Sequence, residues 1–332
     1  MRKIAVVIGS RANWGRLKAV CQAIDNHPDL ELTLIKAASA YDLPIEADYS
    51  LQCLIDGDNT EAMALTTGVF LTQIGGVLSS LNPDMVLIHG DRYEMLAVAI
   101  AASYMNIPLA HSEGGEKTGT IDDKVRYAIS HLTDIHFPVT ELSASRLRAI
   151  GKQNIHVVGS TALDLLTNID LTNNRKEPYI VILHHPNTTD PEDITPLIEA
   201  VKQIPMHKVW VNPNVDAGNK HMLKMIHKQE VEFVKNLPPE EFARLINNCE
   251  CLVGNTSAGI KEGAYLGVPY VCVGNRQDGR EITSSVTRAP NSTDEIFQAI
   301  LEQSGKRYKP DFLFGRGNAG KKIADILAEV KI

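Results

Sequence analysis

The sequence has few cysteines, no excess of positive charge and no metal-binding pattern. Its formal net charge is −7 at pH 7, which argues against a general nucleic-acid-binding protein because such proteins are usually basic. The five cysteines include no CxxC pair, and we therefore interpret them as small buried hydrophobic residues. The eleven histidines show no ligand spacing on one helix face, so we predict no structural metal.

The sequence also lacks an uninterrupted apolar run of the length needed to span a bilayer. Residues 1–10, MRKIAVVIGS, resemble a short signal peptide, but the apolar run is brief and no cleavage-like site follows. We therefore expect a buried first strand in a cytoplasmic protein with no membrane partner. No GxGxxG follows that strand, so the dinucleotide-binding fingerprint is absent.

What the sequence does contain is a regular alternation of short apolar runs and amphipathic segments. Its 332 residues are enough for two domains with a core each. Nearly continuous apolar strands between helices predict parallel sheets covered on both faces. Strands are predicted at 3–9, 30–37, 84–90, 107–113, 134–140, 155–160, 179–185, 208–213, 231–237, 249–255 and 269–274. Helices are predicted at 14–26, 60–81, 92–105, 123–132, 141–150, 193–204, 218–228, 239–248, 257–267, 293–303 and 318–330.

A polar stretch at 167–178 interrupts the alternation and ends in proline, which predicts a linker. Because the alternation then restarts, we predict an α/β protein with two Rossmann-like domains facing a cleft. The first domain spans 1–167 and the second spans 178–317. Ligands of such domains bind beyond the carboxyl ends of the strands, so the residues that follow each strand are the candidates for function.

The stretch 111–123, HSEGGEKTGTIDD, gathers carboxylates after a predicted strand. Glycine and aspartate are common in surface loops, and one aspartate could cap the next helix, but capping does not account for all the acids. Carboxylates crowded into a cleft raise one another's pKa, which suits general acid and base chemistry near neutral pH. Asp91-Arg92 follows another strand and is either a helix cap or an acid with an anion clamp. The acids in 111–123 are Glu113, Glu116, Asp122 and Asp123.

Strand ends in the second half of the chain carry groups that suit a nucleotide diphosphate. In HHP, proline stops the strand and leaves His185 as either a core histidine or a phosphate ligand. The small residues GNTSAG at 254–259 open a helix whose free N–H groups suit an anion. Glu262, one turn further, could accept hydrogen bonds from ribose hydroxyls. The cations that follow predicted strands are Arg11, Arg276 and Arg280. A nucleotide sugar would use these groups together with the carboxylates of the first domain.

Six motifs follow one another along the chain: HGDR (89–92), EGGE-x-x-GTIDD (113–123) with Arg126, HHP-x-TTD (184–190), NP-N-x-DAG (212–218), GN-T-S-x-G-x-x-E (254–262) and GNRQ-x-GR (274–280). In this order, and over nearly the whole chain, they resemble the UDP-N-acetylglucosamine 2-epimerases. The closer likeness is to the hydrolysing branch, which makes free N-acetylmannosamine for sialic acid synthesis.

The resemblance implies a two-domain fold of the glycosyltransferase-B type, with the C-terminal helix at 318–332 packing back on the first domain. It also implies a mechanism in which a carboxylate removes the C2 proton, UDP leaves C1, and a glycal forms. Water then adds across the double bond with inversion at C2. The reaction requires no metal and no redox cofactor, and members of the family are commonly dimers and sometimes tetramers.

The resemblance further implies roles for single residues. Arg92 and Arg126 would order the acids or the sugar, and His185 would assist the leaving diphosphate. The acid and base set would be Asp91, Glu113, Asp122 and Asp123. UDP would be held by Arg11, Asn214, Thr256, Ser257, Glu262 and Arg276.

Two departures from the family pattern leave alternatives open. Asn13 and Trp14 stand where Asp followed by Tyr or Phe is expected, and segment 40–58, which borders the sugar pocket in this fold, is short. The same chemistry on UDP-2,4-diacetamido-2,4,6-trideoxyglucose or GDP-N-acetylglucosamine, on the route to legionaminic acid, is one alternative. A non-hydrolysing epimerase is another, although that branch tends to carry HRREN where this chain has HHPNTTD. A glycosyltransferase would not need the acids at 113–123, and a regulatory binding protein would have lost a catalytic acid.

Overall fold

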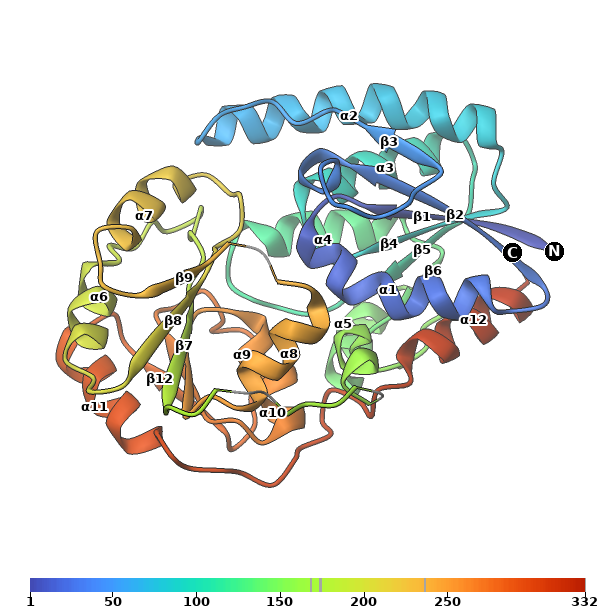
Figure 1. Cartoon of the computed structure of the whole chain (residues 1–332). Helices are drawn as coiled ribbons and strands as arrows, with labels where there is room; N and C mark the ends of the chain where they lie inside the picture. The colour runs from blue at the N-terminus through green and yellow to red at the C-terminus, as the bar shows by residue number, and fades with distance from the viewer. Residues whose placement is uncertain (168, 173–174, 236, 332) are drawn as a thin grey trace. The chain divides into compact units, whose positions relative to one another are not determined.

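The computed structural model describes residues 1–167, 169–172, 175–235 and 237–331. The chain, coloured along its length in Figure 1, divides into two compact units. Unit 1 comprises Met1–Lys117, Ile121–Asp164 and the residues from Gly315 onward, and unit 2 comprises Thr118–Thr120 and Leu165–Phe314. Residues 168, 173 and 174 of the predicted linker, residue 236 of a predicted strand and residue 332 lie outside the described residues.

Unit 1 is built on a parallel sheet. Its strands, within the described part of the chain, are β1 (Arg2–Ile8), β2 (Leu30–Ala37), β3 (Tyr49–Leu51), β4 (Met85–His89), β5 (Leu109–Ser112) and β6 (Ile135–Phe137). Their spatial order is β3-β2-β1-β4-β5-β6. This is the order of a doubly wound sheet, in which the direction of growth reverses between β1 and β4 and ligands bind at that reversal.

Helices cover both faces of this sheet (Figure 1). Alternate residues of a strand point to opposite faces. Ile4, Val6 and Ile8 of β1 pack in a cluster with residues of α1 and α12, whereas Ala5 and Val7 pack in a cluster with residues of α2 and α3. The described helices of unit 1 are α1 (Arg11–Asp25), α2 (Thr60–Leu81), α3 (Tyr93–Tyr104), α4 (Ile121–Leu132), α5 (Glu141–Ala149) and α12 (Ala319–Glu329). Short 3₁₀ segments lie at Ala38–Ala40 in unit 1 and at Thr161–Thr167, where the chain passes from unit 1 to unit 2.

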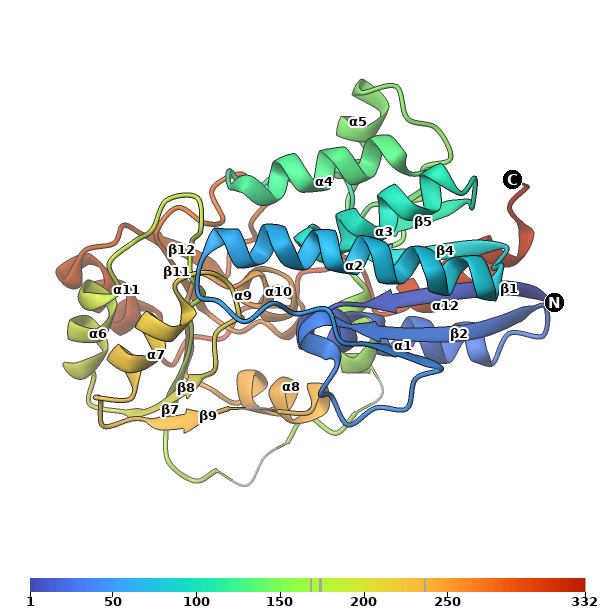
Figure 2. The same ribbon diagram turned by 90° about the horizontal axis from the view of Figure 1, so that it is seen from above.

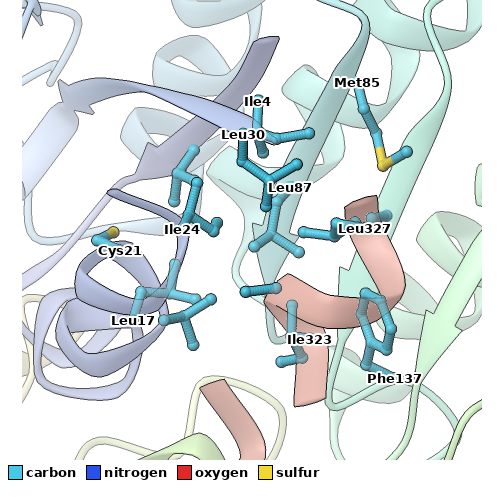
Figure 3. Close-up of a cluster of buried hydrophobic side chains, with 14 of the residues drawn as sticks. Ile4, Leu17, Cys21, Ile24, Leu30, Met85, Leu87, Phe137, Ile323 and Leu327 are labelled. Atoms are coloured by element: carbon cyan, nitrogen blue, oxygen red, sulfur yellow. The ribbon is translucent and has the colours of Figure 1, made fainter. Parts of the chain in front are cut away.

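Helix α12 belongs to unit 1 although it follows all of unit 2 in the chain. Its buried residues Ile323 and Leu327 lie in one hydrophobic cluster with Leu17 of α1 (Figure 3). Arg2, which begins β1, donates a hydrogen bond from Nη1 to the carbonyl oxygen of Val330 at 2.9 Å. The last helix is therefore fixed to the first strand and the first helix of the chain.

Helix α2 corrects the expectation that no segment is long and apolar enough for a bilayer. Among the described residues it is the one helix that passes this test by length and composition. Phe70, Ile74 and Leu78, at every fourth position, have no exposed surface and lie in the core cluster of unit 1. The apolar window of α2 is 28% buried, so one face of the helix belongs to the core of unit 1, and a single helix of this length is weak evidence for a membrane span.

Unit 2 repeats the doubly wound plan. Its described strands are β7 (Tyr179–Leu183), β8 (His207–Val211), β9 (Glu232–Val234), β10 (Cys251–Gly254), β11 (Tyr270–Val273) and β12 (Val286–Ala289), in the order β12-β11-β10-β7-β8-β9. The described helices are α6 (Thr195–Lys202), α7 (Asn219–Ile226), α8 (Pro239–Asn247), α9 (Ser257–Ile260), α10 (Glu262–Leu266) and α11 (Thr293–Gln303). Helices α6, α7 and α11 lie on one side of β7 and β8, with α9 and α10 on the other (Figure 2). The direction of growth reverses between β7 and β10.

The predicted fold class is confirmed, and most predicted elements lie within a few residues of their observed bounds. The strand predicted at 155–160 is wrong, since in this fully described stretch only Ile155 makes an isolated bridge, to His136. The prediction has no strand at β3 or β12, which are edge strands of 3 and 4 residues. The helix predicted at 257–267 is interrupted at Lys261 and forms α9 and α10.

Candidate active site

The first group of candidate residues lies at the carboxyl ends of the unit 1 strands. β4 ends at His89 and β5 ends at Ser112, and these two residues are partners in the parallel register. Asp91 and Glu113 follow them by two residues and one residue, so the two acids emerge from neighbouring strand ends. This is the edge of the sheet at which doubly wound proteins bind ligands.

Arg126 of α4 joins two of the predicted acids. Its side chain is 1% exposed, and its guanidinium pairs with the carboxylates of Asp91 and Asp123. It also donates to the carbonyl oxygen of Glu116 at 2.9 Å. Burial lowers the pKa of Arg126, but the three neighbouring carboxylates outweigh that effect and hold the pKa above its ordinary value. The cation is therefore permanent, and it fixes the positions of both paired carboxylates.

Glu113 has a different set of neighbours. Ser160 Oγ donates a hydrogen bond to Oε1 at 3.0 Å, and Arg16 Nη1 donates to the same oxygen at 3.4 Å. His89 Nε2 lies 3.6 Å from Oε2. The residue is 6% exposed, and its backbone φ of +65° is in the left-handed region, which is uncommon for a residue with a side chain. Strained backbone of this kind clusters at functional sites, which supports a functional role for Glu113.

Three other predicted residues of unit 1 stand at the starts of helices. Asp122 is half-buried in the first turn of α4, next to Asp123. Arg92 precedes α3 and donates to the fully buried Glu94, with Nε 3.0 Å from Oε2 and Nη2 2.9 Å from Oε1. Arg11 begins α1, and burial lowers the pKa of its guanidinium. Arg92 thus has a carboxylate partner outside the predicted set of acids.

The second group of candidate residues lies in unit 2, between the ends of β7 and β10. Asn255 is fully buried; its Oδ1 accepts the backbone N–H of His185 at 2.7 Å, and its Nδ2 donates to the carbonyl oxygen of His185 at 2.9 Å. The carbonyl oxygen of Asn255 accepts Arg276 Nη1 at 3.0 Å and Gln277 Nε2 at 2.9 Å. One asparagine therefore holds His185 and Arg276 at the point where the unit 2 sheet reverses direction.

The imidazole of His185 has a defined proton position. Its Nδ1 accepts the backbone N–H of Asn214 at 3.1 Å. Because an accepting ring nitrogen carries no proton, the neutral ring carries its proton on Nε2 and can donate it to an anion. The neighbouring His184 is instead a core histidine, whose pKa is lowered to about 3, mainly by burial.

The remaining predicted nucleotide ligands occupy two short helices. The hydroxyl of Thr256 accepts the N–H of Ala258 at 3.2 Å and so caps α9. Ser257 is the first residue of α9, and Glu262, which is 8% exposed, is the first residue of α10. Thr256, Ser257 and Glu262 lie near Asn255 because they follow it closely in the sequence. Across the residues that the structure describes, no group of three or more His, Cys, Asp or Glu side chains is arranged to hold a metal ion.

The residues in these two groups that the sequence analysis does not single out include Arg16, His89, Ser160 and Asn255. His89 and Asn255 belong to motifs that lie at the ends of strands. Their position at a strand end is therefore a sequence signal that marks them as candidates. Ser160 lies 47 residues from Glu113 in the chain, and no spacing rule connects the two. Arg16 lies within α1, where an arginine is ordinary.

Comparison with known proteins assigns the chain to a family. Residues 17–328 match the family model described as UDP-N-acetylglucosamine 2-epimerase. The chain is 32% identical to the UDP-N-acetylglucosamine 2-epimerase of Neisseria meningitidis serogroup B, over 96% of this chain and 92% of that protein. It is 30% identical to the hydrolysing UDP-N,N'-diacetylbacillosamine 2-epimerase of Legionella pneumophila, over 100% of this chain and 97% of that protein.

A solved structure is also similar in fold. The UDP-GlcNAc 2-epimerase from Neisseria meningitidis, bound to UDP-GlcNAc, matches with a TM-score of 0.83 at 20% identity, over 99% of this chain and 100% of that chain. Two doubly wound parallel sheets in series define the chain as a two-domain protein of the glycosyltransferase-B type. Within that class, the chain belongs to the UDP-N-acetylglucosamine 2-epimerase family, as the six motifs indicate.

Proposed function

We propose that the protein is a hydrolysing UDP-N-acetylglucosamine 2-epimerase that forms free N-acetylmannosamine and UDP. In the first step a carboxylate takes the C2 proton, the bond from C1 to the UDP oxygen breaks, and a C1–C2 double bond forms. In the second step water adds its oxygen to C1, and a proton is delivered to the opposite face of C2. The reaction supplies sialic-acid-type synthesis in the cytoplasm and uses no metal or redox cofactor.

The observation that carries this proposal is the contrast between two carboxylates at neighbouring strand ends. Asp91 is paired with the permanent cation Arg126, whereas Glu113 is surrounded by Ser160, Arg16 and His89. Removal of a proton from one face of C2 and delivery of a proton to the other face need two separately held groups, and the two carboxylates have different neighbours. Asp91 and Glu113 take these two roles in the proposal. Asp122 and Asp123 are further members of the acid and base set.

The groups of unit 2 suit the departing diphosphate. Nε2 of His185 carries a proton, and Arg276 adds a cation beside Asn255. Donors and cations that meet negative charge as it develops on a leaving group lower the barrier of the reaction. In the proposal, UDP is also held by Arg11, Asn214, Thr256, Ser257 and Glu262.

Two features favour the hydrolysing branch. The chain carries HHPNTTD at 184–190 rather than HRREN. Two relatives are named as hydrolysing enzymes, the protein of Legionella pneumophila at 30% identity and one of Campylobacter jejuni at 28%.

Proton NMR of the protein with UDP-N-acetylglucosamine in D2O tests the proposal. We expect free N-acetylmannosamine with deuterium at C2, together with UDP, because the C2 proton is exchanged with solvent during elimination and hydration. The product UDP-N-acetylmannosamine would assign the chain to the non-hydrolysing branch. Retention of protium at C2 in the product would contradict the elimination step.

Two matched variants make the test specific for the proposed acid. Glu113→Gln keeps the size of the side chain and removes the carboxylate, so we expect turnover to fall by at least about 100-fold, with UDP binding retained. Glu141→Gln makes the same change on a side chain that is 70% exposed, and we expect full turnover. Equal turnover in the two variants would remove Glu113 from the acid and base set.

A second candidate substrate is supported by the names of the same two relatives. Both act, by name, on diacetylbacillosamine carried by UDP or by GDP and UDP. Segment 40–58, next to the sugar pocket expected for this fold, is also short. The D2O assay with UDP-2,4-diacetamido-2,4,6-trideoxyglucose and GDP-N-acetylglucosamine decides between these sugars by their kcat/KM.

A further inference from the structure

We propose that His89 is a positioning residue for Glu113 and that the hydroxyl of Ser112 determines which nitrogen of His89 carries the proton. His89 Nε2–H then points its partial positive charge at the carboxylate, 3.6 Å from Oε2, and so favours one orientation of Glu113 for proton transfer. The inference rests on the proposed function, in which Glu113 belongs to the acid and base set. It extends that function by assigning a role to two residues that do not contact the sugar in the proposed mechanism.

The three side chains form a continuous buried row across two strand ends. His89 is 2% exposed, Ser112 is 1% exposed and Glu113 is 6% exposed. His89 Nδ1 lies 2.8 Å from Ser112 Oγ, and His89 Nε2 lies 3.6 Å from Glu113 Oε2. Because His89 and Ser112 are register partners in β4 and β5, the sheet itself fixes this arrangement.

The hydroxyl of Ser112 has one proton and two possible hydrogen-bond acceptors. Oγ is 2.8 Å from His89 Nδ1 and 3.4 Å from the carbonyl oxygen of Ile88. The shorter contact is a good hydrogen bond with either atom as the donor, and the carboxylate beside Nε2 favours the direction in which Ser112 donates to Nδ1. Donation to Nδ1 makes that nitrogen an acceptor, so the neutral ring carries its own proton on Nε2. A ring with Nε2–H toward a carboxylate is also the orientation that electrostatics favours.

The two oxygens of Glu113 therefore have different anchors. Ser160 and Arg16 donate to Oε1, from the segment that follows β6 and from α1. His89 faces Oε2. The left-handed backbone conformation of Glu113 restricts the directions in which its side chain can point from the end of β5. Loss of the His89 contact would remove a neighbour that orients Oε2, so the plane of the carboxylate could turn by small changes in several side-chain dihedrals.

The first test does not depend on activity. Long-range proton–nitrogen correlation spectra of protein labelled with ¹⁵N-histidine report which ring nitrogens carry protons, and the His89 signals are those lost in His89→Gln. We expect a protonated Nε2 and an unprotonated Nδ1, and a shift of the proton toward Nδ1 in Ser112→Ala. A wild-type ring with its proton only on Nδ1 would overturn the inference. A ring protonated on both nitrogens would overturn the role of Ser112.

The second test uses two amides that each replace one ring nitrogen. In His89→Gln the amide reaches the place of Nε2 and can donate to Glu113, whereas in His89→Asn it reaches only the place of Nδ1 and contacts Ser112. We expect kcat to stay within about 10-fold of wild type for His89→Gln and to fall by about 100-fold or more for His89→Asn, with KM nearly unchanged in both. Exposed His131→Gln serves as the control, with unchanged kcat.

The outcomes separate the inference from the proposed function. Equal losses of kcat in the Gln and Asn variants, or a loss that appears in KM, would overturn the positioning role. If the variants at His89 do not fold, Ser112→Ala carries the kinetic test, with an expected fall in kcat of about 3- to 10-fold and an unchanged KM. Absence of turnover by the wild-type protein on all the candidate sugars would refute the proposed function, while the NMR result would still decide the proton position.

Discussion

At the scale of the residue, one buried guanidinium determines where two candidate acids lie. Arg126 pairs with Asp91 and Asp123, whose side chains are 25% and 16% exposed. Removal of one member of a buried ion pair leaves the partners with uncompensated charge, and lysine keeps the charge but loses the planar fork. We expect Arg126→Met to lower the free energy of unfolding by roughly 3 kcal/mol and Arg126→Lys by roughly 1 kcal/mol. Urea titration measures both.

A surface pair provides the control for this prediction. Arg148 pairs with Glu141, and the two side chains are 51% and 70% exposed. Exposed pairs contribute about 0–1 kcal/mol, so Arg148→Met should change the free energy of unfolding by less than about 1 kcal/mol. If Arg126→Met were as mild as Arg148→Met, the ion pairs at the strand ends would not organise the acids.

The sequence predicts candidate residues where a rule links position to chemistry. Asp91 and Glu113 follow apolar strands, and residues in that position reach the ligand edge of a parallel sheet. Ser160 has no such signal because its contact with Glu113 depends on folding of the whole unit. Asn13 departs from the family pattern, and only the structure shows a contact that explains it. Its Nδ2 donates to the carbonyl oxygen of His89 at 3.4 Å, and an aspartate has no N–H for that contact.

At the scale of the element, β10 passes so close to β7 that its last residue must be glycine. Gly254 has a φ of +136°, and a Cβ there would lie 2.1 Å from the carbonyl oxygen of Leu183. Alanine would force the two strand ends apart and move Asn255 away from His185. We expect Gly254→Ala to lower the free energy of unfolding by roughly 2–3 kcal/mol and to weaken UDP binding. Urea titration and calorimetry measure the two effects.

The same substitution in a helix should have the opposite sign. A Cβ at Gly68 of α2 would meet nothing within 4 Å, and alanine is favoured over glycine in helices by about 0.5–1 kcal/mol. Gly68→Ala should therefore stabilise the protein and leave UDP binding unchanged. Native stability and UDP affinity in Gly254→Ala would show that the strand ends accommodate a side chain.

Long elements are easier to predict from sequence than short ones, because a long element shows more repeats of its apolar pattern. Helix α2 has 22 residues, and its predicted bounds of 60–81 are the observed ones. Strand β3 has 3 residues and is an edge strand, so its formation depends on pairing with β2 rather than on a local pattern. At 155–160 the reverse holds: the apolar pattern is present, but beside β6 the segment forms one isolated bridge, at Ile155, and a few further backbone hydrogen bonds instead of a regular strand ladder.

At the scale of the whole molecule, three buried histidines link stability to pH. His111 and His136 of unit 1 and His184 of unit 2 have pKa values lowered from 6.5 to about 4, 3 and 3, mainly because burial disfavours the charged ring. Above pH 6.5 these rings are neutral in the folded and the unfolded chain. Below it the unfolded chain binds protons that the folded chain does not, so stability falls until the folded pKa is reached.

We therefore expect acid to destabilise unit 1 more steeply than unit 2. Between about pH 6.5 and pH 4, each histidine should lower the free energy of unfolding by roughly 1 kcal/mol per pH unit. Urea unfolding at several pH values, with hydrogen exchange to separate the units, measures these slopes. His136→Leu should flatten the slope of unit 1, and His131→Gln on the surface should not. A slope that His136→Leu leaves unchanged would contradict the assignment.

The return of α12 to unit 1 affects the order in which the two units can fold during synthesis. Ile323 and Leu327 complete the unit 1 core beside β1 and α1, yet the ribosome makes them after the whole of Leu165–Phe314. Every strand of unit 2 is therefore available while one face of the unit 1 sheet still lacks its last helix. Domains generally fold in order from the N-terminus as they are made, but here the second unit can close first. On this face, β1 is covered by α1 early in synthesis, but its cover is complete only when a helix more than 300 residues later has been made.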